Sequence, residues 1–317
     1  MLKHRLTFGP LMIAALLGLF WLDDRMDHWD ISGTWAQTVF MGRTYLPSGL
    51  LMLAAMLALI GVISRELCVI FQAKGIRAQR TIVTVAGMLG ALMIYSIPQA
   101  STSRTAIAVI ATMLVVVFLL SLLKHCWGGR TDGAVAVAAA TMFAMVYLGI
   151  LPGFLLAIRR WHSAWVVAGV ILVTKSCDIG AYFTGRAIGR HKLIAWLSPG
   201  KTWEGLAGGI LFSALTAFLL AWANNRWGIT GLMNGQSPVR TFTPGHFHLG
   251  RSAGAGALMG VCGQLGDLTA SLFKRDAGIK DSGSLVPGFG GLIDIADSPV
   301  VVAPLAYWLL MFGDMYH

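Results

Sequence analysis

The sequence predicts an all-α fold, that of a polytopic integral membrane protein with about nine transmembrane helices. Of its 317 residues, 56% are hydrophobic and only 12% are charged, and the mean hydropathy is +0.71. A soluble globular protein carries about twice that charged fraction. The apolar residues also fall in runs close to the roughly 20 residues that a helix needs to cross a bilayer. Basic residues gather between alternate runs.

Nine apolar segments are candidate spans. They cover residues 6–22, 46–64, 81–98, 106–123, 134–156, 163–182, 205–223, 253–270 and 299–313. The first segment continues through Phe20 and Leu22 without a small-x-small cleavage site, which favours an uncleaved span over a signal peptide. The eighth is rich in glycine, and small residues let helix backbones approach closely in lipid. The ninth is shorter than the others.

The distribution of charge orients these spans. The net charge is +10, and lysine and arginine favour the cytoplasmic side. Basic residues precede the first span and follow the second, fourth, sixth and eighth, whereas the acidic segment DDRMDHWD follows the first. We therefore expect the even-numbered loops in the cytoplasm. Arg159 and Arg160, after the fifth span, and the arginines of the 223–252 loop are exceptions. We attribute the positive charge to orientation and anionic lipid headgroups, not to nucleic acid.

The acidic residues are concentrated towards the C-terminus. Half of the fourteen lie between Asp178 and Asp297. This asymmetry predicts an N-terminal membrane-helix scaffold, residues 1–160, and a C-terminal catalytic membrane domain, residues 161–317, whose site loops face the cytoplasm. The four cysteines form no CxxC pair, which argues against a zinc site and a disulfide framework.

The stretch SLFKRDAGIKDSGSLVPGFGGLIDIADS, residues 271–298, is unusually charged for this chain. Acidic side chains at membrane depth are costly unless they face a cavity, pair with cations or bind ions. Asp267 lies near the cytoplasmic end of the eighth span, and Asp294 and Asp297 precede the ninth. If the latter two lie in a helix, their three-residue spacing puts both carboxylates on one face. Three carboxylates with few thiols or imidazoles nearby suit Mg²⁺.

Two features of the same stretch leave alternatives open. The aspartates could instead pair with the neighbouring cations, Lys274, Arg275 and Lys280, in a solvated loop. The PGFGG segment, residues 287–291, lets the backbone come close to a ligand. It has neither the spacing of a Walker A loop nor a GxGxxG followed by a helix. Phosphate binding here is therefore expected without a P-loop.

A second polar cluster follows the sixth span. Asp178 lies in an apolar run three residues after Lys175, and the two could simply neutralise each other. The segment SPGKTWEG then contributes Ser198, Lys201, Thr202 and Glu204. A cation beside hydroxyl donors is a natural clamp for a polyphosphate. The same segment also has the features of a helix start, in which a threonine caps the helix and binds no ligand.

Together these segments resemble the signature of phosphatidate cytidylyltransferases, also called CDP-diacylglycerol synthases. The matching positions are Ser271, Lys274, Arg275, Lys280, Asp281, Gly283, Pro287, Gly288, Gly290, Gly291, Asp294 and Asp297. The stretches DIGAYFTGR and SPGKTWEG are also similar to that family, and the resemblance covers about residues 165–317. Three positions depart from its pattern. Phe289 replaces the usual histidine, Ile295 the usual arginine, and Ala270 a frequent acid.

The resemblance implies that the chain converts CTP and phosphatidate to CDP-diacylglycerol and pyrophosphate. It implies Asp267, Asp294 and Lys274 as catalytic residues and Asp267, Asp294 and Asp297 as ligands of Mg²⁺, with a second cation by analogy. The implied substrate-binding residues are Ser198, Lys201, Thr202, Glu204, Ser271, Arg275, Lys280, Asp281, Gly288, Gly290 and Gly291. The expected partners are CTP, phosphatidic acid and membrane lipids, with a homodimer left open. The simplest location is a bacterial inner membrane with the active site on the cytoplasmic side.

Three other functions fit parts of the sequence. A CTP-dependent lipid or prenol kinase would also need an interfacial metal site, but it would release CDP in place of pyrophosphate. A transporter or channel lined by Asp178 and Asp267 would predict inverted sequence halves, which we do not find. A catalytically silent homologue would account for the departures at Phe289 and Ile295.

Overall fold

The computed structural model describes residues 2–39, 44–97, 103–127, 129, 131–227, 247–279, 282–283 and 290–314. Its elements are, in chain order, α1 (Leu2–Met26), α2 (Trp35–Val39), α3 (Leu50–Ala73), α4 (Arg80–Ser96), α5 (Ser103–Trp127), α6 (Ala134–Ala144), the π-helix η1 (Met145–Ile150), α7 (Leu151–Trp161), α8 (Ala164–Ile188), β1 (Lys192–Ile194), β2 (Ser198–Thr202), α9 (Trp203–Trp227), α10 (Leu249–Asp276) and α11 (Leu292–Asp314). The described chain is thus almost entirely helical, as predicted.

Every predicted span overlaps a helix or, for the fifth, the continuous α6–η1–α7 segment. Six of these helices, within the residues that the structure describes, are long and apolar enough to cross a membrane. They are Leu50–Ala73, Thr105–Trp127, Ala134–Trp161, Ala164–Ile188, Trp203–Trp227 and Leu292–Met311. The chain is therefore an integral membrane protein, whereas the predicted count of nine spans is not confirmed.

The helices extend beyond the apolar runs that predicted them. The helix α3 continues to Ala73, past the predicted end at residue 64, and α11 begins at Leu292, before the predicted start at residue 299. In both cases the additional turns carry charged residues, which a hydropathy criterion leaves out. The extension of α11 places Asp294 and Asp297 in helical conformation, as their expected shared face requires.

The SPGKTWEG segment differs in part from the predicted helix start. Ser198–Thr202 forms the strand β2, which pairs antiparallel with β1, and the helix α9 begins only at Trp203. The hydroxyl of Thr202 accepts a hydrogen bond from the backbone N–H of Gly205 at 3.1 Å. Thr202 therefore caps α9, and the capping alternative drawn from the sequence is confirmed although the residues before it are extended.

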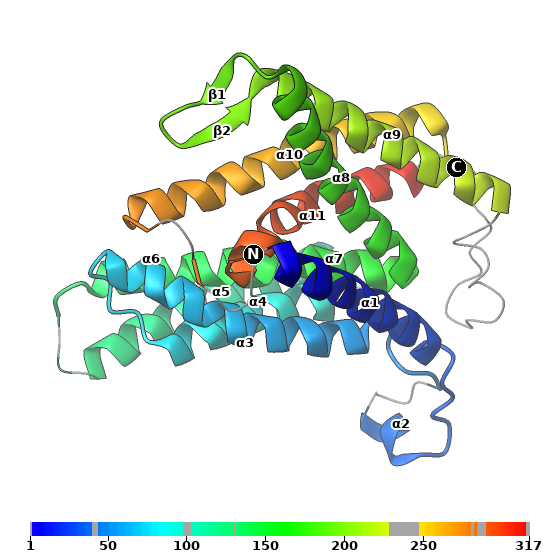
Figure 1. The fold of residues 1–317 in the computed structure, drawn as a ribbon. Coiled ribbons are helices and arrows are strands. Elements are labelled where there is room, and N and C mark those ends of the chain that lie inside the picture. The colour runs from blue at the N-terminus through cyan, green and yellow to red at the C-terminus, as the bar shows by residue number, and fades with distance from the viewer. Residues whose placement is uncertain are drawn as a thin grey trace.

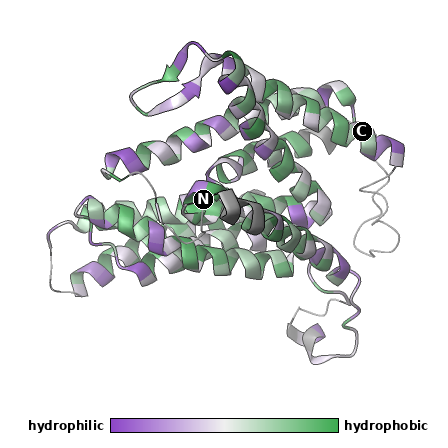
Figure 2. Ribbon diagram, in the orientation of Figure 1, coloured by the Kyte–Doolittle hydropathy of each residue, from purple (hydrophilic) through white to green (hydrophobic). Residues whose placement is uncertain are grey.

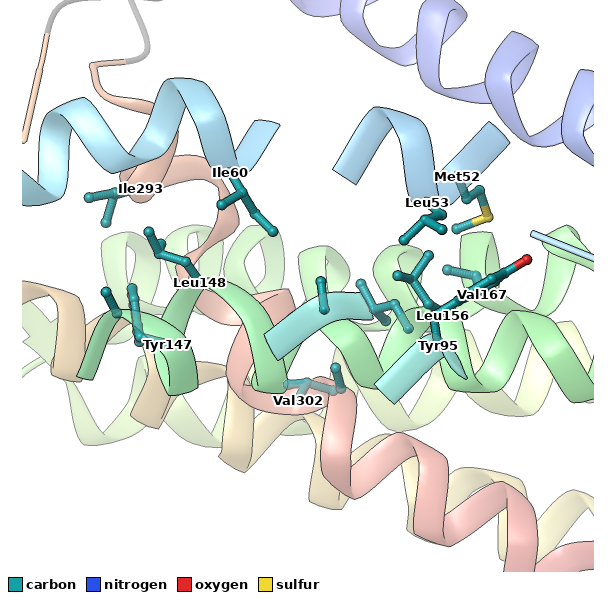
Figure 3. Close-up of a cluster of buried hydrophobic side chains, with 14 of the residues drawn as sticks. Met52, Leu53, Ile60, Tyr95, Tyr147, Leu148, Leu156, Val167, Ile293 and Val302 are labelled. Atoms are coloured by element: carbon teal, nitrogen blue, oxygen red, sulfur yellow. The ribbon is translucent and has the colours of Figure 1, made fainter. Parts of the chain in front are cut away.

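The helices lie in two groups. In Figure 1, α3, α4, α5 and α6 lie together in the lower half of the view, whereas α9, α10 and the β1–β2 hairpin lie in the upper half. Hydrophobic residues dominate the helices, and hydrophilic ones gather at their ends and in the hairpin (Figure 2). Part of the core is drawn in Figure 3, with labels on Met52, Leu53, Ile60, Tyr95, Tyr147, Leu148, Leu156, Val167, Ile293 and Val302. These residues come from α3, α4, η1, α7, α8 and α11, and the same core includes buried residues of α1, α6 and α10.

Arg159, an exception to the predicted charge distribution, is buried in an ion-pair cluster. Only 2% of it is exposed, and its guanidinium contacts Asp23 at 2.6 Å and Asp27 at 2.7 Å. Asp23 also accepts the backbone N–H of Met52 at 3.0 Å, near the start of α3. Burial raises the pKa of Asp27, and Arg159 lowers it in part. The arginine after the fifth span thus pairs with the acidic segment after the first, and both were predicted on the same side of the membrane.

We expect Arg159→Ala to lower the free energy of unfolding by about 3–5 kcal/mol, because removal of one partner leaves buried carboxylates without a cation. Thermal unfolding in detergent measures this loss. The control is Arg25→Ala, which removes an exposed guanidinium 5.2 Å from the Trp21 ring and should cost about 0.5–1 kcal/mol. An equal effect of the two substitutions would contradict a structural role for the buried cluster.

Candidate active site

A close approach of α10 and α11 brings two of the predicted carboxylates to one place. A Cβ atom at Gly266 would lie 2.7 Å from the backbone oxygen of Asp297, so only glycine fits there without displacement. The next residue, Asp267, interacts electrostatically with Asp297. Asp297 is 4% exposed, and its Oδ1 accepts hydrogen bonds from the backbone N–H and the hydroxyl of Ser298, at 2.6 and 3.0 Å.

The hairpin supplies a lysine to this group. Lys201, on β2, places its Nζ 2.7 Å from Oδ2 of Asp267 and 3.4 Å from the backbone oxygen of Gln264. The Gln264 side chain in turn donates to Asp178 at 3.1 Å, and Asp178 pairs with Lys175 at 3.2 Å. The sequence had left open that Lys175 and Asp178 neutralise each other, and the structure shows that pair, extended into a network by Gln264.

Lys274 and Asp294 form a second ion pair. Their Nζ and Oδ1 atoms are 2.5 Å apart, and the two side chains are only 13% and 16% exposed. The other oxygen of Asp294 lies 3.2 Å from the hydroxyl of Ser282 and from the backbone nitrogen of Gly291, both hydrogen-bond donors. The alternative drawn from the sequence is therefore confirmed in part, since Asp294 does pair with Lys274, but the pair is largely buried and is not in a solvated loop.

Glu66 is a member of the site that the sequence analysis missed. It lies on α3, is 4% exposed, and accepts hydrogen bonds from the backbone N–H groups of Leu292 and Ile293 at 2.9 and 3.0 Å. The hydroxyl of Ser282 lies 3.3 Å from its Oε2. Residues 65–66 follow the second predicted span, residues 46–64, and therefore fall in a loop that the charge pattern predicts to be cytoplasmic. The apolar residues after Glu66, LCVIF, were the available signal that the helix continues.

Other predicted substrate-binding residues have structural contacts. Glu204 holds the start of the hairpin, because it accepts from the backbone nitrogen of Arg190 at 3.2 Å and contacts Nδ1 of His191 at 2.6 Å. Arg275 is exposed and donates to the backbone oxygen of Ile279 at 3.3 Å. Ser198 lies on β2 opposite Ile194, and Ser271 is half-buried on α10. Gly290 has a positive φ of 93°. Lys280, Asp281, Gly288 and the departure Phe289 lie outside the described residues.

The carboxylates fit a magnesium ion in part. Within the described ranges, no three His, Cys, Asp or Glu side chains are arranged to hold a metal by themselves. Mg²⁺ does not require such a cage, since it is commonly bound by one or two carboxylates together with substrate phosphates. Asp297, which is buried, and Asp267, which interacts with it electrostatically, would supply two carboxylates with hard oxygen donors. Asp294 differs, because its oxygens already face Lys274 and two further donors.

An apolar cavity of about 1840 Å³ adjoins these charges. Its wall is contributed mainly by α1, α3, α8, α9, α10 and α11, and it includes Lys175, Asp294 and Asp297. Ile295, where the resemblance expected arginine, also lines the cavity and makes that part of the wall apolar. Ala270, where an acid is frequent, is 1% exposed, and an acid there would be buried.

A comparison with models of protein families shows which family the chain belongs to. A model of the cytidylyltransferase family matches residues 30–312, a range that contains every residue of the site. The chain belongs to the cytidylyltransferase family. The matched range includes most of the N-terminal half and Glu66, whereas the resemblance identified from motifs covers about residues 165–317.

Three curated relatives illustrate the similarity. The chain is 36% identical over 152 residues to phosphatidate cytidylyltransferase of Haemophilus influenzae, covering 48% of each protein. It is 31% identical over 195 residues to the uncharacterized protein YnbB of Escherichia coli, covering 57% of this chain and 59% of that one. It is 32% identical over 232 residues to phosphatidate cytidylyltransferase of Pseudomonas aeruginosa, covering 72% and 75%. The chain therefore spans about half to three fifths of the length of the first two relatives.

Proposed function

We propose that this protein transfers the cytidylyl group of CTP to phosphatidate and releases pyrophosphate, in phospholipid biosynthesis. The observation that carries the proposal is an apolar cavity lined at one part by Lys175, Asp294 and Asp297, together with the ion pairs Lys201–Asp267 and Lys274–Asp294. These residues come from the segments that resemble the phosphatidate cytidylyltransferase signature. The family match and the names of two of the relatives support it.

The reaction exchanges one phosphorus–oxygen bond for another. A phosphate oxygen of phosphatidate forms a bond to the α-phosphorus of CTP. The bond from that phosphorus to the oxygen bridging to the β-phosphorus breaks, and pyrophosphate leaves with the electron pair. A phosphate monoester is already an anion near neutral pH, so the site needs no strong general base. Positioning and neutralisation of charge then supply most of the catalysis.

The lysines are suited to hold the phosphates. An ammonium group has three donors, and the pairs with Asp267 and Asp294 use only part of that capacity in Lys201 and Lys274. Asp267 and Asp297 would hold Mg²⁺, with Asp294 completing the predicted set once its present partners rearrange. When bound, Mg²⁺ would neutralise the phosphate oxygens and the developing charge on the leaving group.

The cavity is suited to the acyl chains of the lipid. Its predominantly apolar wall can receive hydrocarbon, while Lys175, Asp294 and Asp297 mark the part where a charged headgroup would lie. Because the basic loops are predicted in the cytoplasm, the site would face that side of a bacterial inner membrane, where CTP is available. The protein would therefore bind its two substrates from different phases, the lipid from the bilayer and CTP from water.

The test uses the purified protein with CTP, Mg²⁺ and vesicles containing phosphatidate. Label on the α-phosphorus of CTP should enter the lipid fraction, whereas label on the γ-phosphorus should appear in pyrophosphate. A lipid kinase would give the reverse, with γ-label in the lipid and CDP in solution. Absence of both products would contradict either enzyme, and vesicles lacking phosphatidate are the control for lipid dependence.

A further inference from the structure

Glu66 connects the first half of the chain to the segment that carries the predicted catalytic aspartates. Both of its carboxylate oxygens are engaged. Oε1 accepts from the backbone N–H of Leu292, and Oε2 accepts from that of Ile293 and lies within hydrogen-bond distance of the Ser282 hydroxyl. These are the first two residues of α11, so a buried side chain of α3 caps a helix that begins more than two hundred residues later.

Two glycines of the segment that resembles the family signature leave space for this carboxylate. A Cβ atom at Gly283 would lie 2.9 Å from Oε1 of Glu66, and one at Gly291 would lie 2.6 Å from Oε2 and still closer to the hydroxyl of Ser282. The sequence predicts that the PGFGG segment, which ends at Gly291, lets the backbone come close to a ligand. The structure shows that Gly291 and Gly283 make room for a protein side chain.

The contact fixes the first turns of α11. The N-terminal N–H groups of a helix lack partners within the helix, and the positive end of its dipole favours an anion. Glu66 satisfies two of those groups. Ser282 lies between Glu66 and Asp294, 3.3 Å from one carboxylate and 3.2 Å from the other. Any displacement of Glu66 would therefore be passed both to Asp294 and to the turn that carries Asp297.

We propose that Glu66 is a positioning residue for the cytidylyl transfer: from α3 it holds the start of α11 so that Asp294 and Asp297 keep their places. This inference rests on the proposed function. It assigns Glu66 no contact with substrate. It also makes the first half of the chain necessary for the geometry of the site.

Glu66→Gln tests the proposal with a side chain of nearly the same shape. The amide would turn N–H donors towards the N–H groups of α11, so at least one acceptor is lost. We expect kcat to fall by about 10–100-fold, the typical cost of losing a supporting contact behind a catalytic group, with a smaller change in KM for CTP. Amide hydrogen exchange at residues 290–297, measured without nucleotide, should become faster.

The matched control is Ser64→Ala on the same helix. Ser64 is also buried, but its hydroxyl donates to the backbone oxygen of Gly61 and accepts from the hydroxyl of Thr84, and neither partner is on α11. We expect kcat and the exchange of residues 290–297 to stay at wild-type values in this variant. Should Glu66→Gln fail to fold, Gly283→Ala serves instead, since its methyl group would press on Oε1 of Glu66. It should show the same two changes.

The outcomes separate this inference from the proposed function. Wild-type kcat and wild-type exchange at residues 290–297 in Glu66→Gln would overturn the positioning role. Exchange that rises equally over the whole chain would also overturn it, since that indicates general loss of stability. If the wild-type protein transfers no cytidylyl group, the proposed function fails. In that case, faster amide exchange at residues 290–297 in Glu66→Gln would still support the inference that Glu66 fixes the start of α11. Unchanged exchange at these residues would contradict it.

Discussion

Replacement of Asp297 by asparagine is expected to lower the rate of liponucleotide formation by about 10²–10³-fold, the range found when one preorganised electrostatic contact is removed from an active site. Asp297 is 4% exposed, lines the cavity and lies beside Asp267. Asparagine keeps an oxygen for the two donors of Ser298 but loses the negative charge. The Mg²⁺ concentration that gives half-maximal activity should rise, and a titration of activity with Mg²⁺ measures both effects.

The control for Asp297 is an aspartate on the surface. Asp276 ends α10 and pairs with Lys74 at 2.6 Å, with 65% and 40% of the two side chains exposed. Exposed pairs of this kind contribute little to stability, so Asp276→Asn should retain wild-type turnover and Mg²⁺ dependence. Wild-type kinetics in Asp297→Asn would contradict the assignment of Asp297 as a ligand of Mg²⁺.

Asp294→Asn is expected to abolish product formation that depends on CTP and Mg²⁺ while the protein remains inserted in the membrane. The substitution removes the charge that faces Lys274 at 2.5 Å, and it brings an amide donor close to the Ser282 hydroxyl and the Gly291 N–H. Lys274 would then be a largely buried cation without its carboxylate. The measurement is the transfer of α-labelled CTP to lipid, normalised to the amount of inserted protein. Undiminished transfer would contradict a catalytic role for Asp294.

A comparison of Asp294→Asn, Lys274→Ala and the double variant tests whether the two residues act as a pair. Lys274→Ala alone should raise the CTP concentration required or lower turnover, because one cation is lost from the site. Residues that act as a unit give strongly non-additive effects. Because Asp294→Asn alone is expected to abolish transfer, the coupling is measured in the free energy of unfolding, which the double variant should lose by less than the sum of the two single variants. Additive losses would mean that Asp294 and Lys274 do not act as a pair.

Much of the molecule could be predicted from local sequence. Long apolar runs predicted the helical membrane fold, because a span must satisfy its backbone internally and bury apolar side chains in lipid. The spacing of Asp294 and Asp297 predicted one helical face, and α11 confirms the helix. The capping features of SPGKTWEG predicted the role of Thr202. Each of these inferences depends on neighbours within a few residues. The division at residue 160 and the roles of the proposed site residues remain predictions.

Contacts between distant segments could not be predicted in this way. Arg159 looked like an exception to the charge rule until the structure placed it against Asp23 and Asp27. Glu66 looked like part of a basic loop until it was found at the start of α11. The sequence by itself determined the helices, the family resemblance and the chemistry of the charged segments. Only the tertiary structure decided which charges meet, because the partners of a buried charge are set by helix packing and not by distance along the chain.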